Sequence, residues 1–362
     1  MQSKFHIDND IAKADTIPSS VYVDLACYEH AKEKLFARSW QFVGDAGQLR
    51  TAGHVRPFAL LEGCLDEPLL LTVDEKMQTH CLSNVCTHRG ALVVEGEGHI
   101  KGMRCRYHGR KFGLDGSFVS MPEFDGVKNF PSEKDNLPRV ALEHWGPFLF
   151  CNLNPAFSFK EWIEPIDQRM NFLPIDRAIF DAAGSRDYFL KANWALYCEN
   201  YLEEFHLPYV HGQSLSGLDY GEYRHELFPY SSIQTGIGKS ADDSFALPKD
   251  HPDSGRNVAA YYCWLFPNLM LNFYPWGISV NVVYPLGVDR TKISFLSFVW
   301  DKDRERSGVG SDLHRVEMED EEVVESVQRG VRSRLYDRGR YSPRREVGTH
   351  HFHKLLARFL ND

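Results

Sequence analysis

Two short segments rich in cysteine and histidine constrain this chain more than any other feature of its sequence. Cys86 and His88 stand in a Cys-Thr-His segment, and Cys105 and His108 stand in a Cys-Arg-Tyr-His segment that follows after sixteen intervening residues. Two thiolates and two imidazoles suit a [2Fe–2S] cluster with unlike irons, because placing both Cys on one iron and both His on the other raises the reduction potential. The alternative is a zinc site, although zinc sites usually pair like residues at each end.

A second group of candidate metal ligands lies in the segment ENYLEEFHLPYVH. His206 and His211 are five residues apart, which on an unbroken helix would separate them by roughly 140°. Pro208 lies between them and is expected to end or kink the helix, so that His211 can turn back toward His206. Two His and one carboxylate form the facial triad of non-haem Fe(II) oxygenases, which leaves coordination positions open for O2.

The third ligand has to come from elsewhere in the chain, and Asp320 is the candidate. Valines follow it at i+3, i+4, i+7 and i+11, so Asp320 is predicted on the apolar face of its helix, where a carboxylate needs a partner or a metal. The alternative is an acid near a helix N-terminus, favoured by the helix dipole, and spacing alone does not separate the two. The neighbouring acids are weaker candidates because they point more toward solvent: Glu319, Glu321 and Glu322.

Charge and hydropathy exclude several classes of function. The 362 residues carry a formal net charge of −9 and show no basic stripe, which argues against a nucleic-acid partner. The most apolar stretches are too short to span a membrane, and the N-terminus lacks a signal-peptide pattern, so a cytoplasmic protein is expected. Eight scattered cysteines in so long a chain favour metal binding over a disulfide framework.

The distribution of strand, turn and helix patterns along the sequence predicts an α+β protein with two domains. Short strands between Gly, Pro and Asp turns indicate a β-rich module over residues 41–155. Residues 1–40 and 156–362 are assigned to a larger domain with antiparallel sheet and helices, and the boundary is expected between Pro155 and Pro165. Helices are predicted over 20–40 and 312–360 and sheet over 261–283 and 292–300, with the strands of the module expected at 54–60, 69–73 and 148–152.

The motifs resemble a known family along the whole chain. CTHRG and CRYHGRKFGLDGSF resemble the two ligand loops of Rieske [2Fe–2S] domains, which implies that Cys86 and Cys105 bind one iron and that His88 and His108 bind the other. The resemblance also implies that the hydroxyl of Tyr107 donates a hydrogen bond to a cysteine sulfur. The chain departs from the commoner pattern at two positions that are not ligands: Arg106, where Pro is frequent, and Arg110, where Trp is frequent.

ENYLEEFHLPYVH and EDEEVVESVQRG resemble the mononuclear-iron motif and the third-ligand helix of Rieske oxygenase α subunits. The resemblance implies a helix-grip-like catalytic domain in which His206, His211 and Asp320 bind Fe(II). It also implies that Glu203 bridges the iron histidine to a Rieske histidine of a neighbouring subunit, and that Asn200 lies near the iron. Glu204 is expected at a solvated helix position instead.

Within the family, the PNLMLNFYPWG segment and the C-terminal tail are most similar to the single-subunit branch that includes choline and carnitine monooxygenases. The expected function is therefore monooxygenation of a quaternary or alkylated amine, with aromatic-ring hydroxylation as the alternative. A Rieske protein that only transfers electrons is the alternative of another class. The resemblance implies a homotrimer and a separate reductase carrying flavin and an Fe–S centre, supplied by NADH or NADPH, because this chain has no G-x-G-x-x-G nucleotide fold.

Two further groups of residues allow more than one interpretation. The aromatic residues of 261–276 could line a substrate pocket or could fill the core of a sheet, and the second view carries at least equal weight. The histidines near the C-terminus could form a metal cluster, but a packed or interface helix is favoured: His350, His351 and His353.

Overall fold

The computed structural model describes residues 5–49, 51–212, 215, 217–304 and 313–362. The contacts divide the chain into two compact units. One unit is Ala37–Ala156, and the other combines the residues up to Phe36 with Phe157–Asp362. Both units contain antiparallel sheets, and together they give the α+β class that the sequence predicts.

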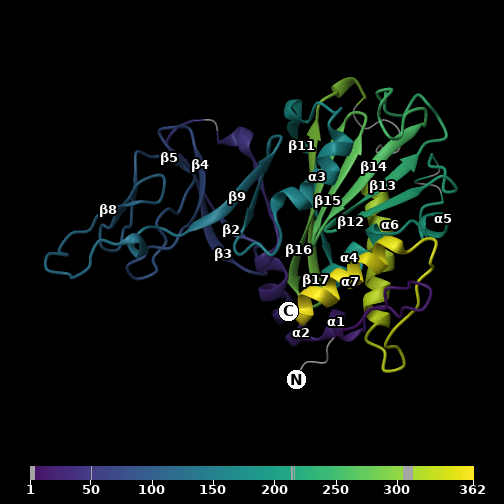
Figure 1. Cartoon of the computed structure of the whole chain (residues 1–362), viewed down its shortest axis with the longest axis horizontal. Coiled ribbons are helices and arrows are strands. Elements are labelled where there is room, and N and C mark those ends of the chain that lie inside the picture. The colour runs from purple at the N-terminus through teal and green to yellow at the C-terminus, as the bar shows by residue number, and fades with distance from the viewer. Residues whose placement is uncertain (1–4, 50, 213–214, 216, 305–312) are drawn as a thin grey trace. The chain divides into compact units, whose positions relative to one another are not determined.

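The smaller unit is built on a seven-stranded antiparallel sheet (Figure 1). The strands predicted at 54–60, 69–73 and 148–152 are all present, and the leucines of the second strand are fully buried. The sheet order is β1 (Gln41–Asp45), β10 (Phe148–Asn152), β9 (Arg139–Trp145), β4 (Thr79–Ser83), β3 (Glu67–Val73), β2 (His54–Leu60) and β5 (Gly98–His99).

A small three-stranded sheet completes this unit and brings the two Cys/His segments into its core. It consists of β6 (Met103–Arg104), β7 (Lys111–Phe112) and β8 (Phe118–Ser120). Cys86 follows β4 and Cys105 follows β6, and both cysteines belong to one cluster of buried residues that also contains Leu70, Leu82 and Phe112. The topology therefore places two segments that are distant in sequence next to each other.

The larger unit has its own seven-stranded antiparallel sheet, from which the walls of the candidate site arise. The predicted sheet regions correspond to its four central strands, whose side chains are almost all buried. The order is β11 (Ile179–Leu190), β17 (Arg290–Val299), β16 (Gly277–Gly287), β15 (Leu269–Tyr274), β14 (Val258–Leu265), β13 (Ser231–Ile237) and β12 (Arg224–Phe228).

Helices pack against this sheet and against one another. α4 contacts α6, α7 and β16, while α3 contacts β13 and β14 (Figure 1). The helices are α1 (Ser20–Val23), α2 (Leu25–Lys34), α3 (Phe159–Met170), α4 (Trp194–Tyr201), α5 (Leu207–Val210), α6 (Leu313–Gly330) and α7 (Val347–Asn361). Short 3-10 turns occupy Phe36–Arg38, Ala46–Gln48, Glu133–Asp135, Ile175–Arg177 and Lys302–Arg304.

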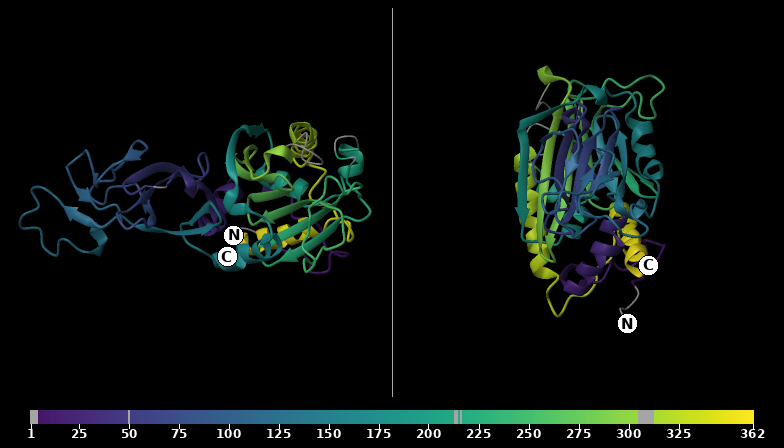
Figure 2. Two further views of the ribbon diagram at one scale, coloured as in Figure 1. Left: turned by 90° about the horizontal axis from the view of Figure 1, so that it is seen from above. Right: turned by 90° about the vertical axis from the view of Figure 1, so that its left-hand side faces the viewer.

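The first described residue, Phe5, contacts the end of the C-terminal helix α7 in the larger unit (Figure 2). The Phe5 backbone N–H donates to Asn361 Oδ1 at 2.9 Å, and Asn361 Nδ2 donates to the Phe5 carbonyl at 2.7 Å. Within the described residues, no helix is both long enough and apolar enough to cross a bilayer.

The sequence predicts helix throughout residues 312–360, but the structure has two separate helices in this region. α6 ends at Gly330 and α7 begins at Val347. The residues between them follow the N-terminal segment, where the Thr16 backbone N–H donates to the Gly339 carbonyl at 3.0 Å. Gly330, a poor helix former, is the last residue of α6, and Pro343 lies shortly before α7, where it cannot supply the N–H of a helix interior.

Candidate functional site

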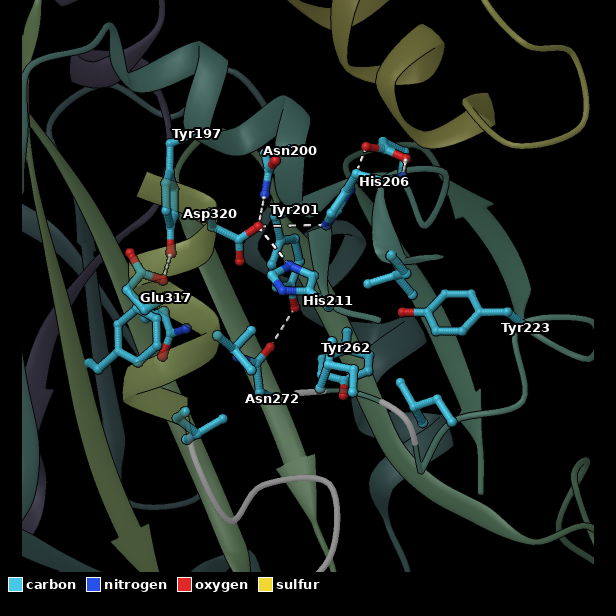
Figure 3. A pocket seen from close by; sticks show the side chains of 18 of the residues that line it. Tyr197, Asn200, Tyr201, His206, His211, Tyr223, Tyr262, Asn272, Glu317 and Asp320 are labelled. Carbon is cyan, nitrogen blue, oxygen red and sulfur yellow. Dashed lines mark hydrogen bonds and ion pairs between the residues drawn. The ribbon is translucent and has the colours of Figure 1, made fainter. Parts of the chain in front are cut away.

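The structure brings His206, His211 and Asp320 together in the larger unit (Figure 3). One potential ligand atom from each residue lies within 4.8 Å of the others. Nε2 of His211 is 2.9 Å from Asp320 Oδ1, and Nε2 of His206 is 3.6 Å from the same oxygen. The two rings and the carboxylate therefore converge on one point, as the predicted triad requires.

The second ring nitrogen of each histidine is held by a carboxylate. Nδ1 of His206 lies 2.5 Å from Glu203 Oε1, and Nδ1 of His211 lies 2.8 Å from Glu319 Oε2. Such contacts set the tautomer, so that Nε2 is left free to bind a metal. Burial would lower the pKa of His211, but Asp320 and Glu319 raise it above its ordinary value. Two imidazoles and one carboxylate around one point, with a further carboxylate behind each ring, fit a divalent metal of intermediate hardness such as Fe(II).

The backbone around Pro208 differs from the one that the sequence predicts. α4 ends at Tyr201, and His206 and His211 flank the separate four-residue helix α5. Pro208 lies in the first turn of α5, where its missing N–H has no helical acceptor to reach and costs nothing. Pro208 was expected to end or kink the helix, but the helix has already ended before it and Pro208 lies in a new one. The expected consequence is nevertheless observed, since the ring centroids of His206 and His211 are 5.2 Å apart.

Asp320 lies on α6, and a residue of α4 holds its carboxylate. Asn200 Nδ2 donates to Asp320 Oδ1 at 2.6 Å, so Asn200 lies beside the triad and not at a solvated position. The apolar face predicted from the valines is only partly buried. Val324 and Val331 are buried, whereas Val327 is 43% exposed. Only a narrow part of the predicted apolar face is therefore buried.

A cavity opens beside the three residues and has walls rich in aromatic rings (Figure 3). It contains about 700 Å³ of space between atoms, part of it open to solvent. None of the lining residues that the structure describes is Lys or Arg. The aromatic lining residues are Tyr197, Tyr201, Tyr223, Tyr262, Tyr274 and Phe295.

Few of the aromatic residues in segment 261–276 line this cavity. Only Tyr262 and Tyr274 line it. Tyr261 faces the opposite side of the sheet, where its hydroxyl donates to Asp253 at 3.0 Å. The remaining aromatic residues of the segment, Trp264, Phe266, Phe273 and Trp276, are buried and do not line the cavity. Because successive side chains of a strand point to opposite faces, most of these aromatic residues fill the core of the sheet and do not line a substrate pocket.

Glu204 is not at a solvated helix position, and that expectation was wrong. The residue is 2% exposed, and its carboxylate binds His225 Nε2 and Arg345 Nη1, the latter at 2.8 Å. Burial would raise the pKa of Glu204, but these two partners lower it below the ordinary value. The chain leaves its helix before Glu204, so helical periodicity could not predict which way this side chain points.

In the smaller unit, the two predicted ligand loops have the same backbone turn. The Gly90 N–H donates to the Cys86 carbonyl, and the Gly109 N–H donates to the Cys105 carbonyl, both at 3.0 Å. Both glycines have a φ near +75°, a conformation that L side chains rarely adopt. The ring centroids of His88 and His108 are 4.8 Å apart, and the two thiols contact each other in the core. Burial raises the pKa of Cys86, as expected for a thiol that needs a metal to become a thiolate.

Comparison with known proteins agrees with both groups of residues. A family model described as the Rieske [2Fe-2S] domain matches residues 39–131, and a model described as the ring hydroxylating alpha subunit (catalytic domain) matches residues 180–362. The chloroplastic choline monooxygenase of Arabidopsis thaliana is 34% identical over 96% of this chain and 83% of its own length. The chain belongs to the Rieske-type ring-hydroxylating oxygenases. The carnitine monooxygenase oxygenase subunit of Escherichia coli (strain K12) is 30% identical over 97% of this chain and 95% of its own.

Solved structures share the fold of this Rieske oxygenase. A quaternary ammonium Rieske monooxygenase superposes with a TM-score of 0.76 at 24% identity, covering 97% of this chain and 96% of the other. A naphthalene 1,2-dioxygenase with bound indole gives 0.74 at 18% identity, covering 98% and 94%. The protein is therefore a Rieske non-haem iron oxygenase, an enzyme with a [2Fe–2S] cluster and a mononuclear iron. This excludes the alternative of a chain that only transfers electrons.

Tyr107 differs from the arrangement that the family resemblance implies. Its ring lies against His108, with the centroids 3.7 Å apart, and the residue is 59% exposed. In the described structure, its hydroxyl forms no hydrogen bond with Cys86 or Cys105. That hydrogen bond stays a prediction for the cluster-bound protein.

The structure explains how the smaller unit accommodates Arg110. The residue is 2% exposed, Nη2 donates to Asp135 Oδ1 at 2.5 Å, and three rings surround the guanidinium at 5.0–5.8 Å: Phe112, Phe118 and Phe130. A flat cation can stack where an aromatic side chain would pack. Arg106, by contrast, is an exposed residue with a weak 3.4 Å contact to Glu95.

Replacing Arg110 by Met is expected to destabilise the smaller unit by about 2 kcal/mol, because it removes a hydrogen bond between charged groups and the contacts of the cation with three rings. The visible circular dichroism of the cluster during urea denaturation reports on this unit alone. Arg106→Met is the matched control and should leave the midpoint unchanged, since exposed ion pairs contribute little. Equal midpoints for both variants would contradict a structural role of Arg110.

The structure also reveals residues that the sequence did not single out. Glu319, a weaker candidate in the sequence, contacts His211. Its position next to Asp320 was the feature of the sequence that could have indicated this contact. Glu317 and Tyr197 meet at the cavity wall, and nothing in their spacing predicted it. The C-terminal histidines lie on α7, where His353 is fully buried and its ring contacts Tyr341 and Tyr22, in keeping with a packed helix.

Proposed function

We propose that this Rieske oxygenase monooxygenates a quaternary or alkylated amine, by hydroxylation or N-dealkylation. The observation that supports this is the cavity beside His206, His211 and Asp320, which combines tyrosine rings with acidic groups and has no Lys or Arg among its described lining residues. Aromatic faces and carboxylates both attract a cation. The names of the choline and carnitine monooxygenases to which the chain is similar point to the same class of substrate.

We further propose the metal ligands that the resemblance implies. His206, His211 and Asp320 hold the mononuclear iron, and Cys86, Cys105, His88 and His108 hold the cluster. The mononuclear iron supplies O2 activation at a position next to the cavity. Glu203 and Glu319 keep the histidine rings oriented, and Asn200 holds the Asp320 carboxylate by its hydrogen bond.

The cavity walls position the substrate and limit access of water. Tyr262 forms a corner with its neighbours: its ring centroid is 6.4 Å from that of the near-parallel Tyr223 and 6.3 Å from that of the perpendicular Tyr274. The hydroxyl of Tyr201 is fixed by Asn272 at 2.6 Å. Preorganised rings lower the entropy cost of holding an alkylammonium group in one orientation.

Enzymes of this family work with a reductase, and we propose that the reductase here carries flavin and an Fe–S centre supplied by NAD(P)H. We also propose that the oxygenase is a homotrimer in which electrons pass between subunits. Inter-subunit electron transfer is named for the quaternary ammonium Rieske monooxygenase that shares this fold. The cytoplasmic location stays a prediction.

Substrate-dependent consumption of O2 and NADH with a matched reductase tests the proposed function. The panel contains trimethylammonium compounds, tertiary amines and aromatic acids, and product formation is followed by mass spectrometry. We expect tightly coupled turnover with at least one trimethylammonium compound. Coupled turnover of an aromatic acid, with none for any amine, would establish the alternative, aromatic-ring hydroxylation.

A further inference from the structure

Glu317 is a buried acid in the cavity wall that the iron site does not use. It lies on α6 one turn before Asp320, so both side chains face the same side of the helix (Figure 3). The residue is 3% exposed. Oε2 accepts a hydrogen bond from the Tyr197 hydroxyl at 2.7 Å, whereas Oε1 is buried and has no partner among the described residues.

Burial and the nearby Asp320 raise the pKa of Glu317, so its ionised form is costly unless a cation accompanies it. A buried carboxylate without a counter-charge loses its hydration, and one hydroxyl donor compensates only part of this loss. The other acidic groups at the cavity, Glu203 and Asp320, already contact His206 and His211. Glu317 therefore remains as the acidic group of the wall whose charge no imidazole or basic side chain of the described residues compensates.

The surroundings of Glu317 determine the charge of that ligand. The cavity presents tyrosine faces and carboxylates, and the lining residues within the described ranges include neither Lys nor Arg. A permanent cation in the cavity favours the ionised form of Glu317 and is attracted by it. A ligand carboxylate, in contrast, would meet like charges and no basic side chain on the described wall.

We propose that Glu317 is the counter-charge for the ammonium group of the substrate, and that the cavity selects a net cation, such as a quaternary ammonium alcohol, over a zwitterion that carries its own carboxylate. This inference rests on the proposed function and specifies its substrate class. Glu317 acts by binding, and the adjacent Tyr197 hydroxyl holds its carboxylate in position.

Glu317→Gln is the decisive variant, because it removes the charge but keeps the size of the side chain and an acceptor for Tyr197. Calorimetry on the iron-loaded protein measures binding of choline, of tetramethylammonium and of the neutral choline isostere 3,3-dimethyl-1-butanol. We expect both cations to bind at least about tenfold more weakly to the variant, and the neutral isostere to bind equally to both proteins. Glu317→Asp, which keeps the charge, should recover part of the affinity.

Glu322→Gln is the matched control, since it removes one exposed carboxylate from the same helix and should change none of these affinities. Equal weakening of the cations and the neutral isostere would overturn the proposal, because it would indicate a packing role. Tighter binding of glycine betaine than of choline to the wild type would overturn the selection for a net cation.

Turnover assays separate this inference from the proposed function. Coupled oxidation of a trimethylammonium compound that Glu317→Gln leaves unchanged in KM would keep the function and overturn the role of Glu317. Absence of amine turnover, together with a charge-specific loss of tetramethylammonium binding in Glu317→Gln, would overturn the function and support Glu317 as a cation-binding residue.

Discussion

Replacing Asp320 by Ala is expected to remove the mononuclear iron and to lower coupled turnover on the order of a thousandfold. The carboxylate is the single anionic member of the proposed triad, and it lies 2.9 Å from one histidine and 3.6 Å from the other. A metal centre supplies several kcal/mol of stabilisation to the reaction, which corresponds to a loss of this size. Iron content should fall from about three to about two per chain, because the cluster contributes two.

The cluster provides an internal control for the Asp320→Ala experiment. Its visible spectrum and its reduction by dithionite should be unchanged, since its proposed ligands lie in the smaller unit. Glu322→Ala, on the exposed side of α6, controls for effects on the helix itself. Three irons per chain in Asp320→Ala, with turnover near that of the wild type, would exclude Asp320 as a ligand.

Replacing Glu203 by Gln is expected to lower turnover about 10- to 100-fold while the mononuclear iron is retained. Glu203 contacts His206 Nδ1 at 2.5 Å and also accepts hydrogen bonds from the backbone N–H groups of Phe205 and His206. An amide can replace one acceptor but not the charge that orients and polarises the ring. The resemblance further implies that electrons reach the iron histidine through this carboxylate.

Single-turnover kinetics distinguish the role of Glu203 in orienting His206 from a role in electron transfer. With the cluster reduced beforehand, we expect substrate and O2 to reoxidise it much more slowly in Glu203→Gln than in the wild type. Glu319→Gln is the matched control, because Glu319 contacts His211 in the same way but is not the implied bridge. If both variants slow reoxidation equally, Glu203 is a positioning residue for its histidine and not part of an electron path.

Much of the architecture followed from local patterns. Strands such as His54–Leu60 and Phe148–Asn152 were predictable because alternating side chains and turn residues act over a few neighbours. The segments that fill the core of the large sheet were recognisable by composition alone. The break between α6 and α7 was missed, although Gly330 and Pro343, which are both unfavourable in a helix interior, lie at its beginning and near its end.

The sequence by itself led to both proposed sets of metal ligands, since these Cys, His and Asp residues stand in motifs that resemble those of one family. The tertiary structure decided what surrounds them. Glu319, Glu317 and Tyr197 reach the site through packing of α6 against α4, which joins residues about 120 positions apart. Glu204 is buried because Arg345 and His225 approach it from distant segments. Such contacts depend on three-dimensional proximity, which no local periodicity encodes.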